Sequence, residues 1–208
     1  MRRIIFATGN QEKMKEIRQI MEGNSIEVCS MKEAGITCEV EENGTTFAEN
    51  ARLKANGIAQ VLKKMYEDSG KECTDIVLAD DSGLEIDALN KEPGVYSARY
   101  MGEDTSYHIK NANLVERLNG VPDEERTARF VCAIAAVLPD GRVLETRETI
   151  EGRIGYEERG ENGFGYDPIF MLPQYGLSTA EISPELKNEL SHRGKALRLM
   201  KEKLKEVL

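Results

Sequence analysis

Length, composition and charge exclude several classes of protein. The chain has 208 residues, of which 40% are hydrophobic and 31% charged, and its formal net charge is −9 at pH 7. This negative charge argues against non-specific nucleic-acid binding, which needs a dense basic surface. No apolar run approaches the length of a membrane span, and the four cysteines contain no C-x-x-C pair. We therefore expect a soluble cytoplasmic protein with reduced thiols and a substantial core.

The N-terminal part of the sequence predicts strands that alternate with helices. Residues 4–7 are an apolar run that predicts a short buried strand. Asn10 is a good helix N-cap, and the helix after it carries apolar residues at helical spacing. Gly23 should end this helix, and residues 26–29 predict a second strand.

A second helix is expected after an acidic loop. Residues 39–44 form that loop, and Thr46 and Glu49 fit a capping box at the start of the helix. Apolar residues at helical spacing continue to about residue 62, although Gly57 should interrupt the helix. Residues 63–75 are polar and predict a helix end followed by a surface loop.

The most informative stretch is an apolar strand that ends in two carboxylates. Val77 to Ala79 precede Asp80 and Asp81, and the strand should break at Ser82-Gly83. Since successive strand residues point to opposite faces, the scaffold can hold one carboxylate while the other stays available. Such a carboxylate can bind a hard cation or take a proton from water. An ordinary turn is the alternative reading.

The C-terminal half predicts a hairpin between helices. A helix is expected over residues 104–118, and two long β-type runs, 128–138 and 143–154, flank a turn at 139–141. Ser183-Pro184 is a helix start, and a final amphipathic helix follows. We therefore predict an α/β fold: a mixed, twisted β-sheet with helices around it.

Three further segments contain residues that could bind a ligand. Residues 8–13 join a strand to a helix start, where backbone N–H groups and Lys13 suit a phosphate, although an ordinary capped helix also explains them. Residues 163–167 combine glycines that permit close approach with Phe164, a flat face for a base. His192 and Arg193 could donate hydrogen bonds to carbonyl or phosphate oxygens.

Together these motifs resemble the inosine triphosphate pyrophosphatase family, also called XTP/dITP diphosphatases or HAM1-like proteins. The similarity runs from about residue 4 to the final helix. The matching motifs are Thr8-Gly-Asn-x-x-Lys13, Glu42-Asn-Gly-x-Thr-Phe-x-Glu-Asn-Ala51, Ala79-Asp-Asp-Ser-Gly-Leu84, Pro93-Gly-Val-Tyr-Ser-Ala-Arg-Tyr100, Gly163-Phe-Gly-Tyr-Asp-Pro-Ile-Phe170 and Lys187-Asn-x-x-Ser-His-Arg193.

The resemblance implies a fold, a reaction and a metal. It implies one domain over residues 1–208, with two lobes around a deep cleft, that assembles as a homodimer. It also implies Mg²⁺-dependent hydrolysis of ITP, dITP and XTP to the monophosphate and pyrophosphate, which removes deaminated purines from the nucleotide pool.

The resemblance also implies roles for individual residues. Asp81 would be the catalytic proton acceptor and a Mg²⁺ ligand, with Glu42 as the second carboxylate and Glu39 or Glu41 as alternatives. Lys54 would lie near the phosphates. The expected substrate-binding residues are Thr8, Gly9, Asn10, Gln11, Glu12, Lys13, Ser82, Phe164, Gly165, Tyr166, Asp167, Lys187, His192 and Arg193.

Two alternatives to this function remain open on the sequence. One is a nucleotide-sensing module that binds a triphosphate without cleaving it. The other is a Maf-like pyrophosphatase that acts on modified pyrimidine nucleotides. Pyrophosphate release would exclude the first, and a panel of purine and pyrimidine substrates would separate the second.

Overall fold

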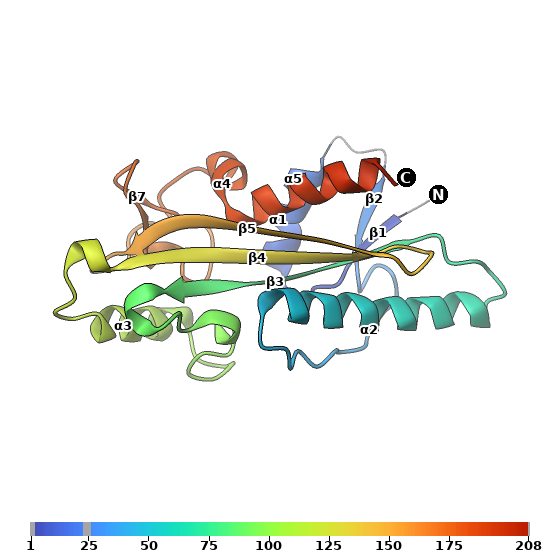
Figure 1. Cartoon of the computed structure of the whole chain (residues 1–208), viewed down its shortest axis with the longest axis horizontal. Coiled ribbons are helices and arrows are strands. Elements are labelled where there is room, and N and C mark those ends of the chain that lie inside the picture. Colours follow the sequence, from blue (N-terminus) through green and yellow to red (C-terminus); the bar gives the residue numbers. More distant parts are fainter. Residues whose placement is uncertain (1–2, 23–25, 208) are drawn as a thin grey trace. The chain divides into compact units, whose positions relative to one another are not determined.

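The computed structural model describes residues 3–22 and 26–207 (Figure 1). The helix end expected at Gly23 lies outside the described residues. The helices are α1 (Gln11–Met21), α2 (Phe47–Asp68), α3 (Tyr107–Arg117), α4 (Pro184–Leu190) and α5 (His192–Lys205). The strands are β1 (Arg3–Phe6), β2 (Glu27–Ser30), β3 (Ile76–Ile86), β4 (Thr127–Val137), β5 (Val143–Ile154), β6 (Phe170–Leu172) and β7 (Leu177–Ser178).

The strands of the described residues form one mixed sheet in the order β2-β1-β3-β4-β5-β6-β7. β1 pairs in parallel with β2 and β3, whereas β6 is antiparallel to both β5 and β7. The α/β prediction is therefore confirmed. In the described part of the chain, no helix is both long and apolar enough to cross a membrane.

The chain divides into two compact units, each built from separate segments. Unit 1 comprises Met1–Asp81, Cys132–Glu148 and Ala196–Leu208, and unit 2 comprises Ser82–Val131 and Thr149–Lys195. The division falls inside β3, between Asp81 and Ser82. β4 and β5 likewise contribute to both units.

The core of unit 1 lies between the strands and the helices α1 and α5. Ile4 and Ile76 pack with Met14 of α1 and Leu197 of α5 in one buried cluster. Figure 1 shows α2 on the side of the strands opposite α1 and α5. Strand alternation directs Ile5, which neighbours Ile4 on β1, to that second side.

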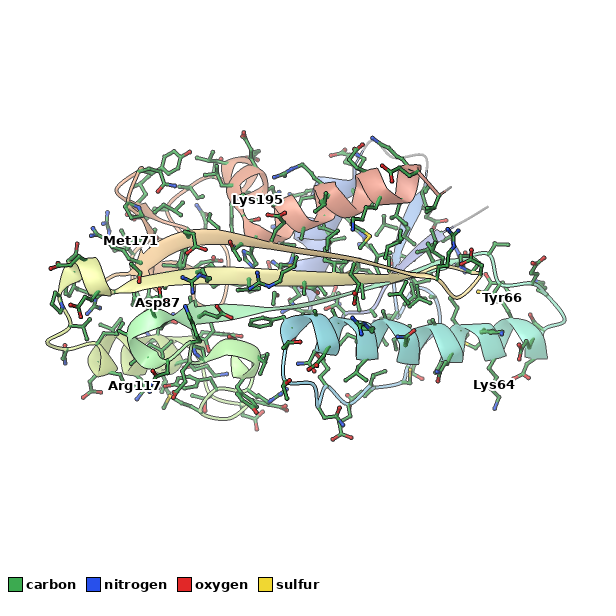
Figure 2. All side chains as sticks on the ribbon, in the orientation of Figure 1. Lys64, Tyr66, Asp87, Arg117, Met171 and Lys195 are labelled. Atoms are coloured by element: carbon green, nitrogen blue, oxygen red, sulfur yellow. The ribbon has the colours of Figure 1, made fainter. Side chains whose placement is uncertain are left out.

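The far end of α2 is tied to the first strand. Figure 2 shows Tyr66 directed toward the sheet and Lys64 directed away from it. Tyr66 donates a hydrogen bond to Asp75 at 2.7 Å, and Asp75 also pairs with Arg3 at 2.7 Å. The side chains between α2 and β3 therefore help to fix the position of β3, which carries the two carboxylates.

Unit 2 has its own core, formed by the second half of β3, β4, α3 and the segment around β6. Leu84 and Ile86 pack with Leu114 of α3 and Phe170 of β6. In Figure 1, α3 and α4 lie on opposite sides of the strands of this unit. β3 thus ends in the unit 2 core, which keeps the residues just before Leu84 in a fixed extended backbone.

Two sequence expectations on these elements are wrong. β3 does not break at Ser82-Gly83 but continues to Ile86, because Leu84 and Ile86 are fully buried in the core of unit 2. Gly57 does not interrupt α2; it lies so close to Val40 that an added Cβ would stand 2.7 Å from Val40 Cγ2. This close approach of the preceding loop explains the glycine.

The local helix signals are confirmed. The Asn10 side chain accepts from the backbone of Glu12 and Lys13, and Thr46 and Glu49 form the complete capping box. Ser183 caps α4 ahead of its proline. α3, however, begins at Tyr107 with Ser106 as its cap, slightly later than expected.

Candidate functional site

Asp80 and Asp81 lie in different surroundings within unit 1. Asp80 is 1% exposed, and its Oδ2 lies 3.0 Å from Lys13 Nζ. Asp81 is half-buried, and Asn50 Nδ2 donates to its Oδ2 at 3.0 Å. As the alternation argument predicted, the scaffold binds one carboxylate tightly while the other keeps solvent access.

Burial raises the pKa of Asp81 to about 6. The hydrogen bond from Asn50 opposes this shift, and the negative charge of Glu42 adds to it. The positive charge of Lys13 lowers the pKa and the charge of Asp80 raises it, each to a smaller extent. A carboxyl with a pKa near neutrality can exchange a proton with water at physiological pH, which suits a general base.

Asn50 is a part of this cluster that sequence reasoning missed. It lies in the first turns of α2, is fully buried, and its Oδ1 accepts from Gly44 N at 2.8 Å. It thereby joins the acidic loop to Asp81. The available signal was a polar residue on the buried face of a helix, next to Ala51.

Glu42 is the glutamate of the acidic loop best placed to act with Asp81. Glu39 and Glu41 are exposed, whereas Glu42 is half-buried and close enough to influence the pKa of Asp81. Lys54 Nζ of α2 lies 2.5 Å from Glu42 Oε1. The structure therefore brings Lys54 to one carboxylate of this cluster, Glu42.

The segment before α1 uses several of its amides internally. Asn10 Oδ1 accepts from Glu12 N at 2.9 Å and from Lys13 N at 3.1 Å, and Thr8 Oγ1 accepts from Asn10 N. Gly9, Asn10, Gln11 and Glu12 are exposed. The strongest phosphate-binding group here is therefore the Lys13 ammonium, which already lies beside Asp80.

The acidic cluster has the chemistry of a small Mg²⁺ site. Among the described residues, no group of three or more His, Cys, Asp or Glu side chains is arranged to hold a metal. Mg²⁺, however, commonly takes one or two carboxylates and completes its shell with water and substrate phosphate. The mutual repulsion between Glu42, Asp80 and Asp81 is the kind that a bound cation relieves. These carboxylates therefore fit the ion.

A cavity of about 630 Å³ lies in another part of unit 1. It is lined by α2, the loop after it and the β4–β5 turn, including Lys63, Cys73 and Pro139. It contains none of the predicted site residues, so cavity size does not locate this site.

In unit 2, Asp167 is fixed by three donors. It is 4% exposed and accepts from Lys187 Nζ at 2.6 Å, from Phe164 N at 2.8 Å and from Thr179 Oγ1 at 2.9 Å. Gly163 leaves room for this arrangement, because an added Cβ would collide with Asp167 Oδ2. Asp167 therefore holds the loop and the lysine together.

Two cationic side chains lie close to the ring of Phe164. Lys187 Nζ lies 4.9 Å from the ring centroid and Arg193 Cζ lies 5.7 Å from it. His192 stacks on Phe130 with a centroid distance of 5.0 Å. The exposed fractions of these side chains are small: 8% for Lys187, 7% for His192 and 3% for Arg193. They are therefore buried polar groups and not ordinary surface residues.

Ser82 and Tyr166, two further predicted site residues of unit 2, also make hydrogen bonds. Arg193 Nη2 donates to Ser82 Oγ at 2.9 Å, so this arginine contacts both Ser82 and the ring of Phe164. Tyr166 is 4% exposed, donates to Ser97 O at 2.6 Å, and meets Tyr107 edge-on. Burial raises the pKa of the Tyr166 hydroxyl, so this residue stays a neutral hydrogen-bond donor.

The predicted site residues thus form two groups. Asp81, Glu42, Lys54 and Lys13 lie together in unit 1. Ser82, Phe164, Asp167, Lys187 and Arg193 are linked by contacts in unit 2. The unit 1 group joins carboxylates and ammonium groups, whereas the unit 2 group adds an aromatic ring with cation–π contacts.

Known proteins are similar to this chain over most of its length. The model of the Ham1 family matches residues 4–203. A Clostridium perfringens protein named dITP/XTP pyrophosphatase is 44% identical over 208 residues, covering 100% of both chains. A protein of the same name from Geobacillus kaustophilus is 43% identical and covers 100% of this chain and 97% of its own.

Solved structures give the same result. The Staphylococcus aureus Ham1 protein superimposes with a TM-score of 0.84 at 38% identity, with 100% of both chains covered. A HAM1 protein from Coxiella burnetii gives a TM-score of 0.82 at 36% identity, with 99% of this chain and 100% of the other covered. The chain belongs to the Ham1 family.

Proposed function

We propose that the chain, as a single domain over residues 1–208, hydrolyses ITP, dITP and XTP to the monophosphate and pyrophosphate. The observation that carries the proposal is Asp81, a half-buried carboxyl with a pKa raised to about 6, beside Lys13, Glu42 and Asp80. The names of the relatives, dITP/XTP pyrophosphatase, support the choice of substrate. Removal of deaminated purine nucleotides from the pool would be the cellular role.

In this proposal Asp81 accepts the proton of the attacking water. The water oxygen forms a bond to phosphorus at the α–β anhydride, and the bond between that phosphorus and the bridging oxygen breaks. Lys13 and Lys54 offset the negative charge that develops on the phosphate oxygens. Asn50 holds Asp81 Oδ2 and so sets which oxygen faces the water. Mg²⁺, held by Glu42 and Asp81, would supply a Lewis acid that lowers the pKa of water and neutralises phosphate charge.

The unit 2 group would bind the purine. Phe164 offers a stacking face, and the buried donors of His192 and Arg193 suit the 6-oxo group of a deaminated purine. The 6-amino group of ATP would face a donor instead, and an unsatisfied buried polar group costs roughly 1–3 kcal/mol, or about 10- to 100-fold in discrimination. Since both Asp167 oxygens already accept hydrogen bonds, we assign Asp167 to holding Phe164 and Lys187.

The remaining parts of the proposal concern cofactor, assembly and location. We propose Mg²⁺ as the cofactor because one or two carboxylates are the protein contribution that this ion needs. We also propose a homodimer in the cytoplasm, as the resemblance implies. Neither nucleic acid nor membrane is a proposed partner.

The test is product identity from purified protein. ITP, dITP, XTP, dGTP, ATP, dTTP and UTP are supplied with Mg²⁺ or with EDTA, and pyrophosphate and orthophosphate are measured separately. We expect pyrophosphate from ITP, dITP and XTP only, and its loss in EDTA. Orthophosphate would mean that a different bond is cleaved, preference for pyrimidine nucleotides would favour the Maf-like alternative, and binding without products would favour the sensing module.

A further inference from the structure

The loop that carries Phe164 is held from α3 by a residue that has no assigned role. We propose that Asn111 is a positioning residue that fixes the carbonyl of Gly165 and thereby the orientation of Phe164. This inference rests on the proposed function, because it takes Phe164 as the surface on which the purine stacks. It adds a determinant of base binding that lies outside the motifs on which the resemblance was recognised.

Asn111 makes its contacts from a fully enclosed position. It is 1% exposed, and its Nδ2 donates to Gly165 O at 3.2 Å and to Glu158 Oε1 at 2.6 Å. The other oxygen of Glu158 lies 2.6 Å from His108 Nδ1, and that histidine is largely exposed. Asn111 therefore connects α3 to the loop directly, whereas His108 reaches only Glu158.

Phe164 is consequently held on both sides along the backbone. Its own N–H donates to Asp167 Oδ2 at 2.8 Å, and the carbonyl of the next residue, Gly165, accepts from Asn111. Gly165 has φ +69, and an added Cβ would stand 3.5 Å from the Tyr107 ring. The two hydrogen bonds hold the peptide groups immediately before and after the Phe164–Gly165 peptide, so they fix the backbone from which the Phe164 side chain extends.

The nitrogen and the oxygen of the Asn111 side-chain amide differ in their partners. Among the described residues, Asn111 Oδ1 is buried with no hydrogen-bond partner. A leucine would remove this buried acceptor, but it would also remove the donor to Gly165 O and to Glu158 Oε1. The two donated hydrogen bonds are therefore what the asparagine contributes at this position, and one of them holds the loop that carries Phe164.

The experiment compares three proteins: wild type, Asn111→Leu and His108→Ala. Asn111→Leu removes the donor to Gly165 O, and His108→Ala is the matched control because it removes a contact to Glu158 without touching the loop. For each we measure KM and kcat with dITP, the inhibition constant of inorganic tripolyphosphate, and the melting temperature. Tripolyphosphate has no base, so it reports the phosphate-binding residues alone.

We expect Asn111→Leu to raise KM for dITP by about tenfold, as for partial loss of one stacking contact. The kcat at saturating dITP should stay within about threefold, and tripolyphosphate inhibition should be unchanged. His108→Ala should match wild type in every measurement. An unchanged KM in Asn111→Leu, or an equal loss of tripolyphosphate binding, would overturn the assignment. If Asn111→Leu does not fold, Asn111→Ala removes the same donor and leaves space instead of adding bulk.

A direct binding measurement separates this inference from the proposed function. Binding of dITP to wild type and Asn111→Leu is titrated calorimetrically in Ca²⁺ with little or no turnover. If wild type binds dITP but cleaves nothing, the proposed function fails, and the ratio of the two dissociation constants still decides the role of Asn111. If wild type does not bind dITP at all, both are overturned.

Discussion

Replacement of Asp81 by asparagine should abolish catalysis and at the same time stabilise the fold. Asp81→Asn keeps the shape of the side chain and an oxygen that can accept from Asn50, but it has no proton to exchange. In wild type, burial raises the pKa of Asp81 from 3.8 to about 6, so the folded protein binds this proton more tightly than the unfolded chain does. Ionisation of Asp81 therefore opposes folding, and the amide removes that cost.

The magnitude follows from the two pKa values. The cost is absent below pH 3.8 and grows as the pH rises through about 6, above which it is constant. With one pKa unit worth about 1.4 kcal/mol, the full cost is about 3 kcal/mol at pH 8 and about 1.6 kcal/mol at pH 5. Asp81→Asn should therefore be more stable than wild type by these amounts, and the gain should be larger at the higher pH.

The assay is urea unfolding at pH 5 and pH 8 in EDTA, followed by tyrosine fluorescence, since the chain has seven tyrosines and no tryptophan. Asp80→Asn is the control: it breaks the pair with Lys13 and should destabilise the protein at both pH values. Pyrophosphate release by Asp81→Asn should be lost while dITP binding remains. A variant less stable than wild type, or a gain independent of pH, would refute the electrostatic account, and retained turnover would refute Asp81 as the base.

Three further predictions concern the same two groups of residues. Asn50→Leu removes a hydrogen bond to the Asp81 carboxylate that is worth roughly 1.5 kcal/mol. The acidic limb of the pH profile of kcat/KM should therefore move upward by about one pH unit. An unchanged limb would mean that Asn50 does not influence the pKa of Asp81. Phe164→Ala should raise KM for dITP by about tenfold or more with tripolyphosphate inhibition intact, and equal effects on both would contradict base stacking. Mg²⁺ should raise the melting temperature of wild type but not of Asp81→Asn, and equal shifts would place the ion elsewhere.

Several parts of the site could not be predicted because they depend on burial and on long-range contacts. Asn50 lies 31 positions from Asp81 in sequence, and Asn111 lies 54 positions from Gly165. Each asparagine is a polar residue on the buried face of a helix, but nothing in either local sequence identifies its partner. Asp167 was expected to bind the substrate, and only its packing reveals that protein donors already occupy both of its oxygens.

The sequence by itself determined the local elements and the motif order. The caps at Asn10, Thr46 and Ser183 were predictable because each is satisfied within three residues along the chain. The tertiary structure alone decided that β3 runs on through Ser82-Gly83, because core burial of the residues beyond outweighs local turn chemistry. It also decided that Asp80 is held tightly while Asp81 titrates near neutrality, since a pKa depends on the charges and the solvent that the folded chain places around a carboxyl.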